Sequence, residues 1–363
     1  MIVPAGGATD GLLDRLARIR ESGDVPLVGD ERWSPAQREA IDAAASGAEL
    51  ADDAAWATLT SGSSGAPRIV LRSAASWADS FPAVAGYLDA GPDDEVLLPA
   101  PPVASLTLFS LAHALDGGPR PSFGSLPRSG AGCLHGTPQA LRAVLDADSA
   151  PGLRAALIGG SHLDPVLRER AQSAGVRVTA YYGAAELSFV AVDEGDGLKA
   201  FPGVELDIRS GELWVRSPFI ASGYAGASGP LRRDGEWATV GDRAELVDGR
   251  LRLLGRADDA ILSASATIVP EEVEAVLRSV PGVRDAIVFG MPREPVGALV
   301  AAFLELDGEP TAELRLATAM RLAPAHRPRR WFAGAIPRTP SGKPARSEAV
   351  RRALAGEVSR LVV

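Results

Sequence analysis

The sequence predicts an α/β protein with a large N-terminal domain of mainly parallel α/β layers plus a small β subdomain, followed by a small α+β C-terminal domain. Three regions differ in pattern. Apolar strand segments alternate with helical segments up to about residue 200, then short strands are joined by Gly/Asp turns, and helices return after residue 258. Strand–helix alternation is typical of a parallel sheet, whose ligands bind beyond the carboxyl ends of the strands.

In the first region, five helices and seven strands are expected. Helices are predicted at residues 11–20, 76–90, 106–118, 138–148 and 164–175. Strands are predicted at residues 25–29, 55–60, 68–73, 94–101, 132–138, 154–161 and 177–188, the last of which runs into a loop. The helix at 138–148 begins with Pro138, which suits the first helical position because that residue needs no N–H partner.

Beyond residue 200 the pattern predicts hairpins and then a compact module. The segments 203–218 and 236–256 are short strands with Gly/Asp turns, as in β-hairpins. Helices are expected at 269–280, 312–322 and 346–356, and strands at 283–291 and 298–306. We therefore place the domain boundary so that residues 1–257 form the N-terminal domain and residues 258–363 form the C-terminal domain.

Composition excludes several classes of protein. The 363 residues carry a formal net charge of −9, so general attraction to nucleic acid or to an anionic membrane is not expected. Cys133 is the only cysteine, which excludes an intramolecular disulfide and fits a reducing cytoplasm. No run of 18 apolar residues predicts a membrane span, and the N-terminus lacks the pattern of an export signal.

The loop "TSGSSGAPR", residues 60–68, is the first candidate site. Its glycines allow backbone N–H groups to converge on an anion, and its hydroxyls and Arg68 add donors. A flexible linker has the same composition. The loop has neither Walker A spacing nor a G-x-G-x-x-G pattern, and Ala66 breaks the G-x-S-x-G pattern of a serine hydrolase.

Four further segments follow in a fixed order, and together they define a resemblance. They are "YYGAAELS" at 181–188, "GELWVRSPFIASGY" at 211–224, "WATVGDRAEL" with "LLGRADDAI" between 237 and 261, and "PRTPSGKPAR" at 337–346. With the opening loop, these five segments resemble the ordered motifs of the adenylate-forming superfamily, which includes acyl-CoA synthetases, adenylation domains and luciferases. The chain is similar to short forms, namely compact bacterial acyl-CoA synthetases and actinobacterial o-succinylbenzoate–CoA ligases.

The resemblance implies a set of site residues. It assigns the ATP phosphates to Thr60, Ser61, Gly62, Ser63, Ser64, Gly65 and Arg68. It assigns adenine and ribose to Gly159, Gly160, Ser161, Tyr182, Gly183, Asp242 and Arg256. It makes Lys343, Glu186 and Arg256 catalytic, Glu186 the ligand of Mg²⁺, and Asp258 the hinge of a mobile C-terminal domain.

Each implied role suits the chemistry of its residue. A carboxylate such as Asp242 accepts hydrogen bonds from two ribose hydroxyls, and Glu186 is a hard oxygen ligand. Lys343 is a compact charge on a long stem, which suits a bridge between the attacking carboxylate and the α-phosphate. The resemblance implies ATP, CoA and a carboxylic acid as substrates, with a carrier-protein thiol as the alternative acceptor.

Several positions depart from the family pattern. Arg68 replaces a lysine, Ala185 replaces a hydroxyl residue, and Val103 with Ala104 replaces an aromatic–histidine pair. Residues 264–266, Ala-Ser-Ala, stand where many relatives have a glycine pair. Where relatives have glycines, added Cβ atoms would narrow the tunnel through which the pantetheine arm of CoA approaches the backbone. The sequence therefore supports the adenylation step more strongly than the thioester step.

The function expected from these residues is that of an AMP-forming acid–CoA ligase. The alternatives are an o-succinylbenzoate–CoA ligase, an enzyme that loads a carrier protein, and a non-catalytic nucleotide-binding homologue. The small, apolar segments expected to line the acid pocket slightly favour a monoacid. Because 59 residues precede the phosphate loop, fewer than in many relatives, an exposed sheet face covered by a homodimer is a further hypothesis.

Overall fold

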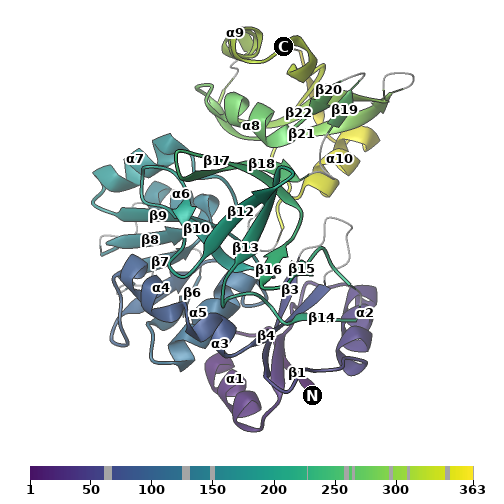
Figure 1. The fold of residues 1–363 in the computed structure, drawn as a ribbon. Coiled ribbons are helices and arrows are strands. Elements are labelled where there is room, and N and C mark those ends of the chain that lie inside the picture. The colour runs from purple at the N-terminus through teal and green to yellow at the C-terminus, as the bar shows by residue number, and fades with distance from the viewer. Residues whose placement is uncertain are drawn as a thin grey trace.

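The computed structural model describes residues 1–60, 68–124, 131–147, 152–226, 228–256, 261–263, 266–293, 297–308, 311–339 and 344–362. These residues form an α/β N-terminal part, an antiparallel β region and a smaller α+β C-terminal module (Figure 1). The predicted fold class is confirmed. The predicted boundary falls on residues 257 and 258, which lie outside the described ranges.

Sheet A contains both the beginning of the chain and a much later strand. Its strand order is β1 (Ile2–Gly6), β2 (Val25–Val28), β3 (Ala54–Thr60), β4 (Arg68–Ser73) and β14 (Gly223–Ala225). The first three strands are parallel, whereas β4 is antiparallel to both β3 and β14. Sheet A therefore places residue 224 beside residue 70.

Sheet B is the larger, mainly parallel sheet. Its strand order is β11 (Lys199–Ala200), β10 (Ser188–Asp193), β9 (Arg177–Ala184), β8 (Ala155–Ile158), β7 (Cys133–Gly136), β5 (Glu95–Leu98) and β6 (Arg120–Phe123). Strands β6 to β9 are parallel to their neighbours, and β10 returns antiparallel to β9. The predicted strand followed by a loop at 177–188 is confirmed, because β9 ends at Ala184 and a turn follows. The sequence did not predict that the chain then pairs back as β10.

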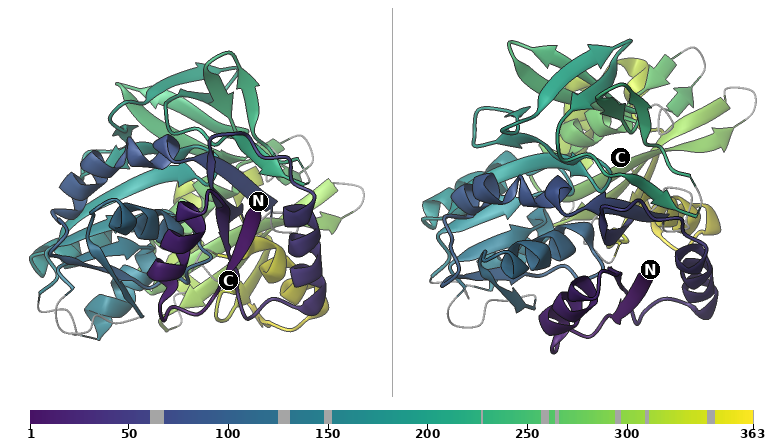
Figure 2. Two further views of the ribbon diagram at one scale, coloured as in Figure 1. Left: turned by 90° about the horizontal axis from the view of Figure 1, so that it is seen from below. Right: turned by 60° about the horizontal axis from the view of Figure 1, so that its bottom comes forward.

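Helices cover both faces of each sheet (Figures 1 and 2). One core joins the facing sides of the two sheets through α1 (Leu12–Glu21), α3 (Ala75–Ala78), α4 (Phe81–Leu88) and α5 (Ser105–Leu115). The outer face of sheet A packs on α2 (Pro35–Ser46), and that of sheet B packs on α6 (Pro138–Asp146) and α7 (Pro165–Ser173). The bare sheet face on which the homodimer hypothesis rested is thus absent from the described part of sheet A.

Two helix predictions need correction. The predicted helix at 76–90 is two helices, α3 and α4, because Pro82 lacks an N–H and begins a new first turn. The Ser80 hydroxyl donates to the Trp77 carbonyl, 2.7 Å away, at the break. Helix α2 was not predicted, although Ser34 and Gln37 form a capping box around Pro35 at its start.

The region after residue 200 is an antiparallel sheet, as the hairpin pattern predicts. Sheet C has the strand order β15 (Arg232–Asp234), β16 (Trp237–Thr239), β13 (Glu212–Arg216), β17 (Asp242–Val247) and β18 (Arg250–Arg256), with β12 (Glu205–Arg209) paired to β13. Its longest hairpin, β17–β18, places Asp242 opposite Arg256 at the end that leads to the C-terminal module.

The C-terminal module is built on sheet D. Its strand order is β20 (Ala266–Ile268), β19 (Ile261–Ser263), β22 (Gly297–Leu306), β23 (Arg330–Ala333) and β24 (Ser359–Leu361), with β21 (Val283–Arg293) paired to β22. Helices α8 (Pro270–Arg278) and α9 (Thr311–Arg321) pack in one core, and α10 (Arg346–Ala355) packs in another. Strands β23 and β24 were not predicted. None of the helices in the described chain has the length and apolar character needed to cross a bilayer.

Candidate active site

The candidate site lies where strands of sheets A and B end. Strand β3 ends at Thr60, β8 ends just before Gly159, and β9 ends two residues before Glu186. A parallel bridge between Leu59 and Ala104 joins the end of β3 to the segment that follows β5. Since β5, β8 and β9 run parallel in one sheet, the carboxyl ends of both sheets meet at this edge, where α/β proteins bind ligands.

The predicted phosphate loop begins and ends on adjacent strands. Thr60 at the end of β3 pairs with Arg68 at the start of β4, so the loop connects an antiparallel hairpin. Five of its predicted phosphate-binding residues lie outside the described ranges: Ser61, Gly62, Ser63, Ser64 and Gly65. Their contact with phosphate stays a prediction.

Glu186 occupies the turn of the β9–β10 hairpin and is 4% exposed. The Tyr224 hydroxyl donates to its Oε1 over 2.9 Å, and the Ala221 N–H donates to its backbone carbonyl over 2.7 Å. Burial, and next the Glu186 charge, raise the pKa of Tyr224, which keeps the phenol protonated as a donor. The carboxylate is thus fixed by a strand that comes from sheet A.

Arg72, which no sequence motif singled out, lies behind Glu186. Its side chain is 0% exposed, and its guanidinium donates to the carbonyls of Ala185, at 2.5 Å, and Phe219. Its Nε has no hydrogen-bond partner among the described residues. Burial lowers the pKa of Arg72 to about 9, and the nearby Glu186 charge opposes that shift. The buried guanidinium therefore fixes the backbone of the turn that carries Glu186 and partly neutralises the charge of the Glu186 carboxylate.

Two of the residues predicted to bind adenine and ribose, Tyr182 and Asp242, are in contact. The Tyr182 hydroxyl in β9 donates to Asp242 Oδ2 at the start of β17. This contact joins sheets B and C at the candidate edge. An ionised carboxylate has about four acceptor positions, so a group of this kind can accept from more than one hydroxyl. Adenine and ribose binding by this pair stay predictions.

Two predicted site glycines are required by packing. A Cβ on Gly183 would lie 2.1 Å from the Ser188 carbonyl oxygen, and a Cβ on Gly159 would lie 2.2 Å from the Tyr181 ring. Gly160 has φ +88°, and both it and Ser161 are exposed just after the end of β8. The close approach at Gly159 is thus made by Tyr181, while Gly160 and Ser161 remain accessible to a ligand.

A buried polar chain beneath this edge was also missed. Ser110 Oγ lies 2.8 Å from His135 Nδ1, and His135 Nε2 lies 3.0 Å from the Tyr181 hydroxyl. Burial lowers the pKa of His135 to about 3, so its imidazole is neutral. The signal in the sequence was a histidine inside an apolar strand, "GCLHGTP". The chain fixes the Tyr181 ring against Gly159.

The remaining predicted site residues are Lys343, Asp258 and Arg256. Lys343 and Asp258 lie outside the described ranges, as do Ala264 and Ser265. Arg256 is described as the last residue of β18, without its side chain. The catalytic, hinge and nucleotide roles of these residues stay predictions.

A magnesium site would depend on Glu186 together with substrate. Within the described ranges, no three His, Cys, Asp or Glu side chains lie together as a metal-binding group. Mg²⁺ is often held by one or two carboxylates plus substrate phosphates and water. One fixed carboxylate beside a predicted phosphate loop fits that pattern, with Glu186 as the protein ligand.

Known proteins resemble this chain in sequence over most of its length. The AMP-binding enzyme family model matches residues 13–225, and the AMP-binding enzyme C-terminal domain model matches residues 272–343. The 2-succinylbenzoate–CoA ligase of Salmonella typhimurium is 32% identical over 76% of this chain and 63% of the relative. A probable 2-succinylbenzoate–CoA ligase of Mycobacterium tuberculosis is 32% identical over 99% of both chains.

Solved structures share the fold. A variant of Escherichia coli MenE with bound OSB-AMS aligns with a TM-score of 0.82 and 23% identity, over 97% of this chain and 87% of that chain. ATP-bound MatB from Rhodopseudomonas palustris aligns with a TM-score of 0.79 and 19% identity, over 96% and 88%. The chain spans 63% of the length of the Salmonella relative, and its family models match both the large domain and the C-terminal module. The chain belongs to the AMP-binding enzyme family.

Proposed function

We propose that the protein is an AMP-forming acid–CoA ligase. In this reaction ATP and a carboxylic acid give an acyl-adenylate and pyrophosphate, and CoA then displaces AMP to give the thioester. The observation that carries the proposal is the meeting of Glu186, the Tyr182–Asp242 pair and the β3–β4 hairpin at one sheet edge in a chain of the AMP-binding family.

The first half-reaction has two electrostatic requirements. The acid carboxylate and the triphosphate are both anions, so their approach needs cations and fixed donors. Lys343 would bridge the attacking oxygen and the α-phosphate. A charge pair at ~4 Å and an effective dielectric of ~20 is worth ~4 kcal/mol, over a hundredfold in rate if it forms chiefly in the transition state.

The other residues would bind and orient ATP. Asp242 would accept from the ribose, Tyr182 would face adenine, and the loop after Thr60 with Arg68 would donate to the phosphates. Glu186 would hold Mg²⁺, which when bound neutralises charge on the phosphate oxygens. The location that fits ATP, CoA and the unpaired, buried Cys133 is the cytoplasm.

The acid-dependent release of pyrophosphate tests the proposal. The purified chain is incubated with ATP, Mg²⁺ and, in turn, o-succinylbenzoate, benzoate and decanoate, and a CoA thioester is sought by mass spectrometry. Lys343→Ala should lower the rate of pyrophosphate release by about a hundredfold or more. An unchanged rate in this variant would contradict the assigned chemistry.

One specific acid has support from the relatives. Two relatives at 32% identity are named 2-succinylbenzoate–CoA ligases, so o-succinylbenzoate is the second, narrower candidate. The apolar segments of the expected acid pocket favour a monoacid instead. The kcat/KM for o-succinylbenzoate, compared with that for benzoate and decanoate, decides between them.

Two further alternatives have distinct results in the same assay. An enzyme that loads a carrier protein would release pyrophosphate but form no CoA thioester. A non-catalytic homologue would show ATP-dependent thermal stabilisation without turnover of any of the acids, since a bound ligand stabilises by mass action.

A further inference from the structure

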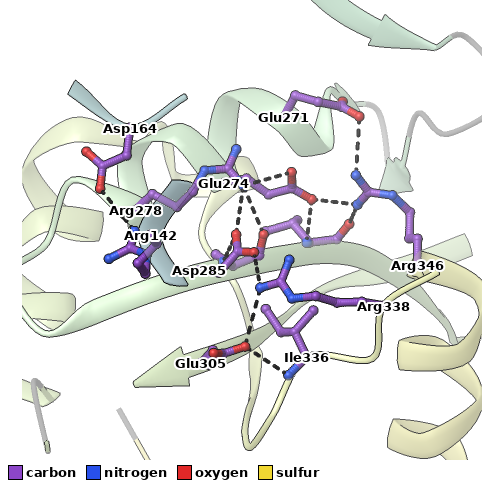
Figure 3. Close-up of polar contacts among 12 residues, drawn as sticks. Arg142, Asp164, Glu271, Glu274, Arg278, Asp285, Glu305, Ile336, Arg338 and Arg346 are labelled. Atoms are coloured by element: carbon purple, nitrogen blue, oxygen red, sulfur yellow. Dashed lines mark hydrogen bonds and ion pairs between the residues drawn. The ribbon is translucent and has the colours of Figure 1, made fainter. Parts of the chain in front are cut away.

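A chain of alternating charges crosses the C-terminal module (Figure 3). We refer to it as the ion-pair chain. Its members, in order of contact, are Glu271, Arg346, Glu274, Arg278, Asp285, Arg338 and Glu305. Arg278 contacts Glu274 at 3.5 Å and Asp285 at 3.4 Å, so the ion-pair chain is continuous from helix α8 to strand β22.

The central members are largely sheltered from water. The side chain of Glu274 is 6% exposed and that of Asp285 is 16% exposed. Glu274 Oε1 also accepts from the Val288 N–H over 2.8 Å, which ties the carboxylate to the middle of β21. Contacts of this kind are screened less by salt than surface pairs, and their geometry is better defined.

The two outer arginines stand on either side of a single short segment of the sequence. Arg338 precedes residues 340–343, and Arg346 follows them at the first position of α10. The backbone closes between these arginines, because Arg338 bridges to Pro344 and the Ala345 N–H donates to the Pro337 carbonyl over 2.8 Å. The described residues on either side of positions 340–343 are thus held against one another.

Both arginines contact β21, and each also contacts a second element, β22 for Arg338 and α8 for Arg346. Arg338 contacts Asp285 at 2.8 Å and Glu305 at 3.4 Å, on β21 and β22. Arg346 contacts Glu274 at 2.6 Å, and it also donates to the Val288 carbonyl. Figure 3 shows the two guanidinium groups reaching Asp285 and Glu274, which Arg278 connects.

We infer that Arg338 and Arg346 are positioning residues for Lys343, an inference that rests on the proposed function. Lysine has a long flexible stem, so the place of its amine depends on how well the backbone beneath it is held. Two guanidinium groups that fix both ends of a short segment limit the positions the amine can take. Because a displacement of about 1 Å can lower a rate by about a hundredfold, removal of either anchor should slow adenylation without weakening substrate binding.

The test compares the two half-reactions in Arg338→Gln and Arg346→Gln. The first is pyrophosphate release from ATP with o-succinylbenzoate, or with decanoate if the wild type prefers it. The second is conversion of the preformed acyl-adenylate to the CoA thioester, which has no attack on ATP. We expect kcat of the first half-reaction to fall about 10–50-fold, with KM for ATP and the rate of the second within about threefold of wild type.

Arg284→Gln is the matched control. Arg284 lies on the same strand as Asp285 and pairs with Glu305 at 3.6 Å and with Asp307, but it does not contact Arg338 or Arg346 in the ion-pair chain. It should retain the wild-type rate in both half-reactions. Arg338→Lys and Arg346→Lys keep the charge and lose the forked geometry, so they should fall between wild type and the glutamine variants.

The outcomes separate the inference from the proposed function. Wild-type adenylation rates in both glutamine variants, while Lys343→Ala is impaired, would overturn the inference alone. The inference would also be overturned if the rates of both half-reactions fell by the same factor and the midpoint of thermal unfolding fell with them. That result would mean that the arginines stabilise the fold and do not position Lys343. Should the glutamine variants not fold, the lysine variants decide between the same outcomes. Full activity of Lys343→Ala would overturn the proposed function itself.

Discussion

Arg72 lies beside the turn that carries Glu186, and Arg338 precedes residues 340–343 in the sequence, but the surroundings of the two arginines differ. Arg72 is 0% exposed, and its guanidinium donates to backbone carbonyls beside Glu186. Arg338 is partly exposed and shares two carboxylates with other arginines. When a buried charge is removed, the groups that it paired with are left unpaired in an apolar interior. When one arginine is removed from a network of partly exposed ion pairs, the carboxylates keep their other arginine partners. The N-terminal site should therefore respond to mutation through stability, and the C-terminal module through rate.

The largest expected effect is that of Arg72→Met. The substitution removes the guanidinium donor to the Ala185 and Phe219 carbonyls, and it removes a positive charge near Glu186. We expect the free energy of unfolding to fall by about 3–5 kcal/mol, measured by urea denaturation. A loss below about 1 kcal/mol, the range of surface pairs, would remove the distinction between the two regions.

A smaller effect is expected from Gly183→Ala in the β9–β10 hairpin. The added Cβ would meet the Ser188 carbonyl oxygen at 2.1 Å, and backbone on both sides must shift. Overpacking of this kind destabilises by about 1–3 kcal/mol, and here it should also displace Glu186 and slow pyrophosphate release. Gly86→Ala is the control, because a Cβ there, within α4, meets nothing within 4 Å. A neutral Gly183→Ala would contradict the packing.

The third prediction concerns pH. Burial lowers the pKa of His113 to about 4 and that of His135 to about 3, and both lie in the N-terminal core. In the unfolded chain histidine titrates near ~6.5, so below this pH the unfolded state binds more protons than the folded state. Stability from these groups is complete above ~6.5 and declines as the pH falls toward 4, by about 1–2 kcal/mol per histidine at pH 5. Urea denaturation of His135→Gln at pH 7 and pH 5 should show a smaller decline than the wild type, and an equal decline would exclude His135 as a source.

The smallest effect is expected from Arg284→Gln in the C-terminal module. Arg284 is 44% exposed and its partner Asp307 is 57% exposed, and pairs as exposed as this one contribute about 0–1 kcal/mol. Unfolding by urea should therefore differ little from the wild type. If the free energy of unfolding fell as much as in Arg72→Met, the ion pairs of the module would be needed for the stability of the fold. Their role would then not be limited to positioning one segment.

Much of the fold was readable from the sequence because it depends on local patterns. Alternating apolar segments identify the strands of sheet B, and Pro138 and Pro165 mark helix starts. The motif order identifies Glu186 and Asp242. The contact between Tyr182 and Asp242 was not readable, since it joins two sheets that no local pattern relates.

What the sequence did not reveal depends on long-range pairing or on burial. Arg72 lies in "RIVLRS", where an arginine on an apparently exposed strand end is unremarkable, and only the tertiary structure buries it. The break between α3 and α4 needed attention to Pro82 within an otherwise helical pattern. Arg338 and Arg346 belong to a motif that was noticed for its lysine, while their partners lie far from them in the sequence.

The position of β14 in sheet A has a consequence for synthesis of the protein. Strand β4 pairs with β3 along one edge, but the partner of its other edge, β14, is synthesised only after the whole of sheet B. During that interval the backbone groups on one side of β4 are open to pairing with another nascent chain. Because β4 and β14 are far apart in the sequence, their pairing should form more slowly than a local hairpin. Until it forms, the unpaired edge of β4 in sheet A is a site at which aggregation can begin during translation.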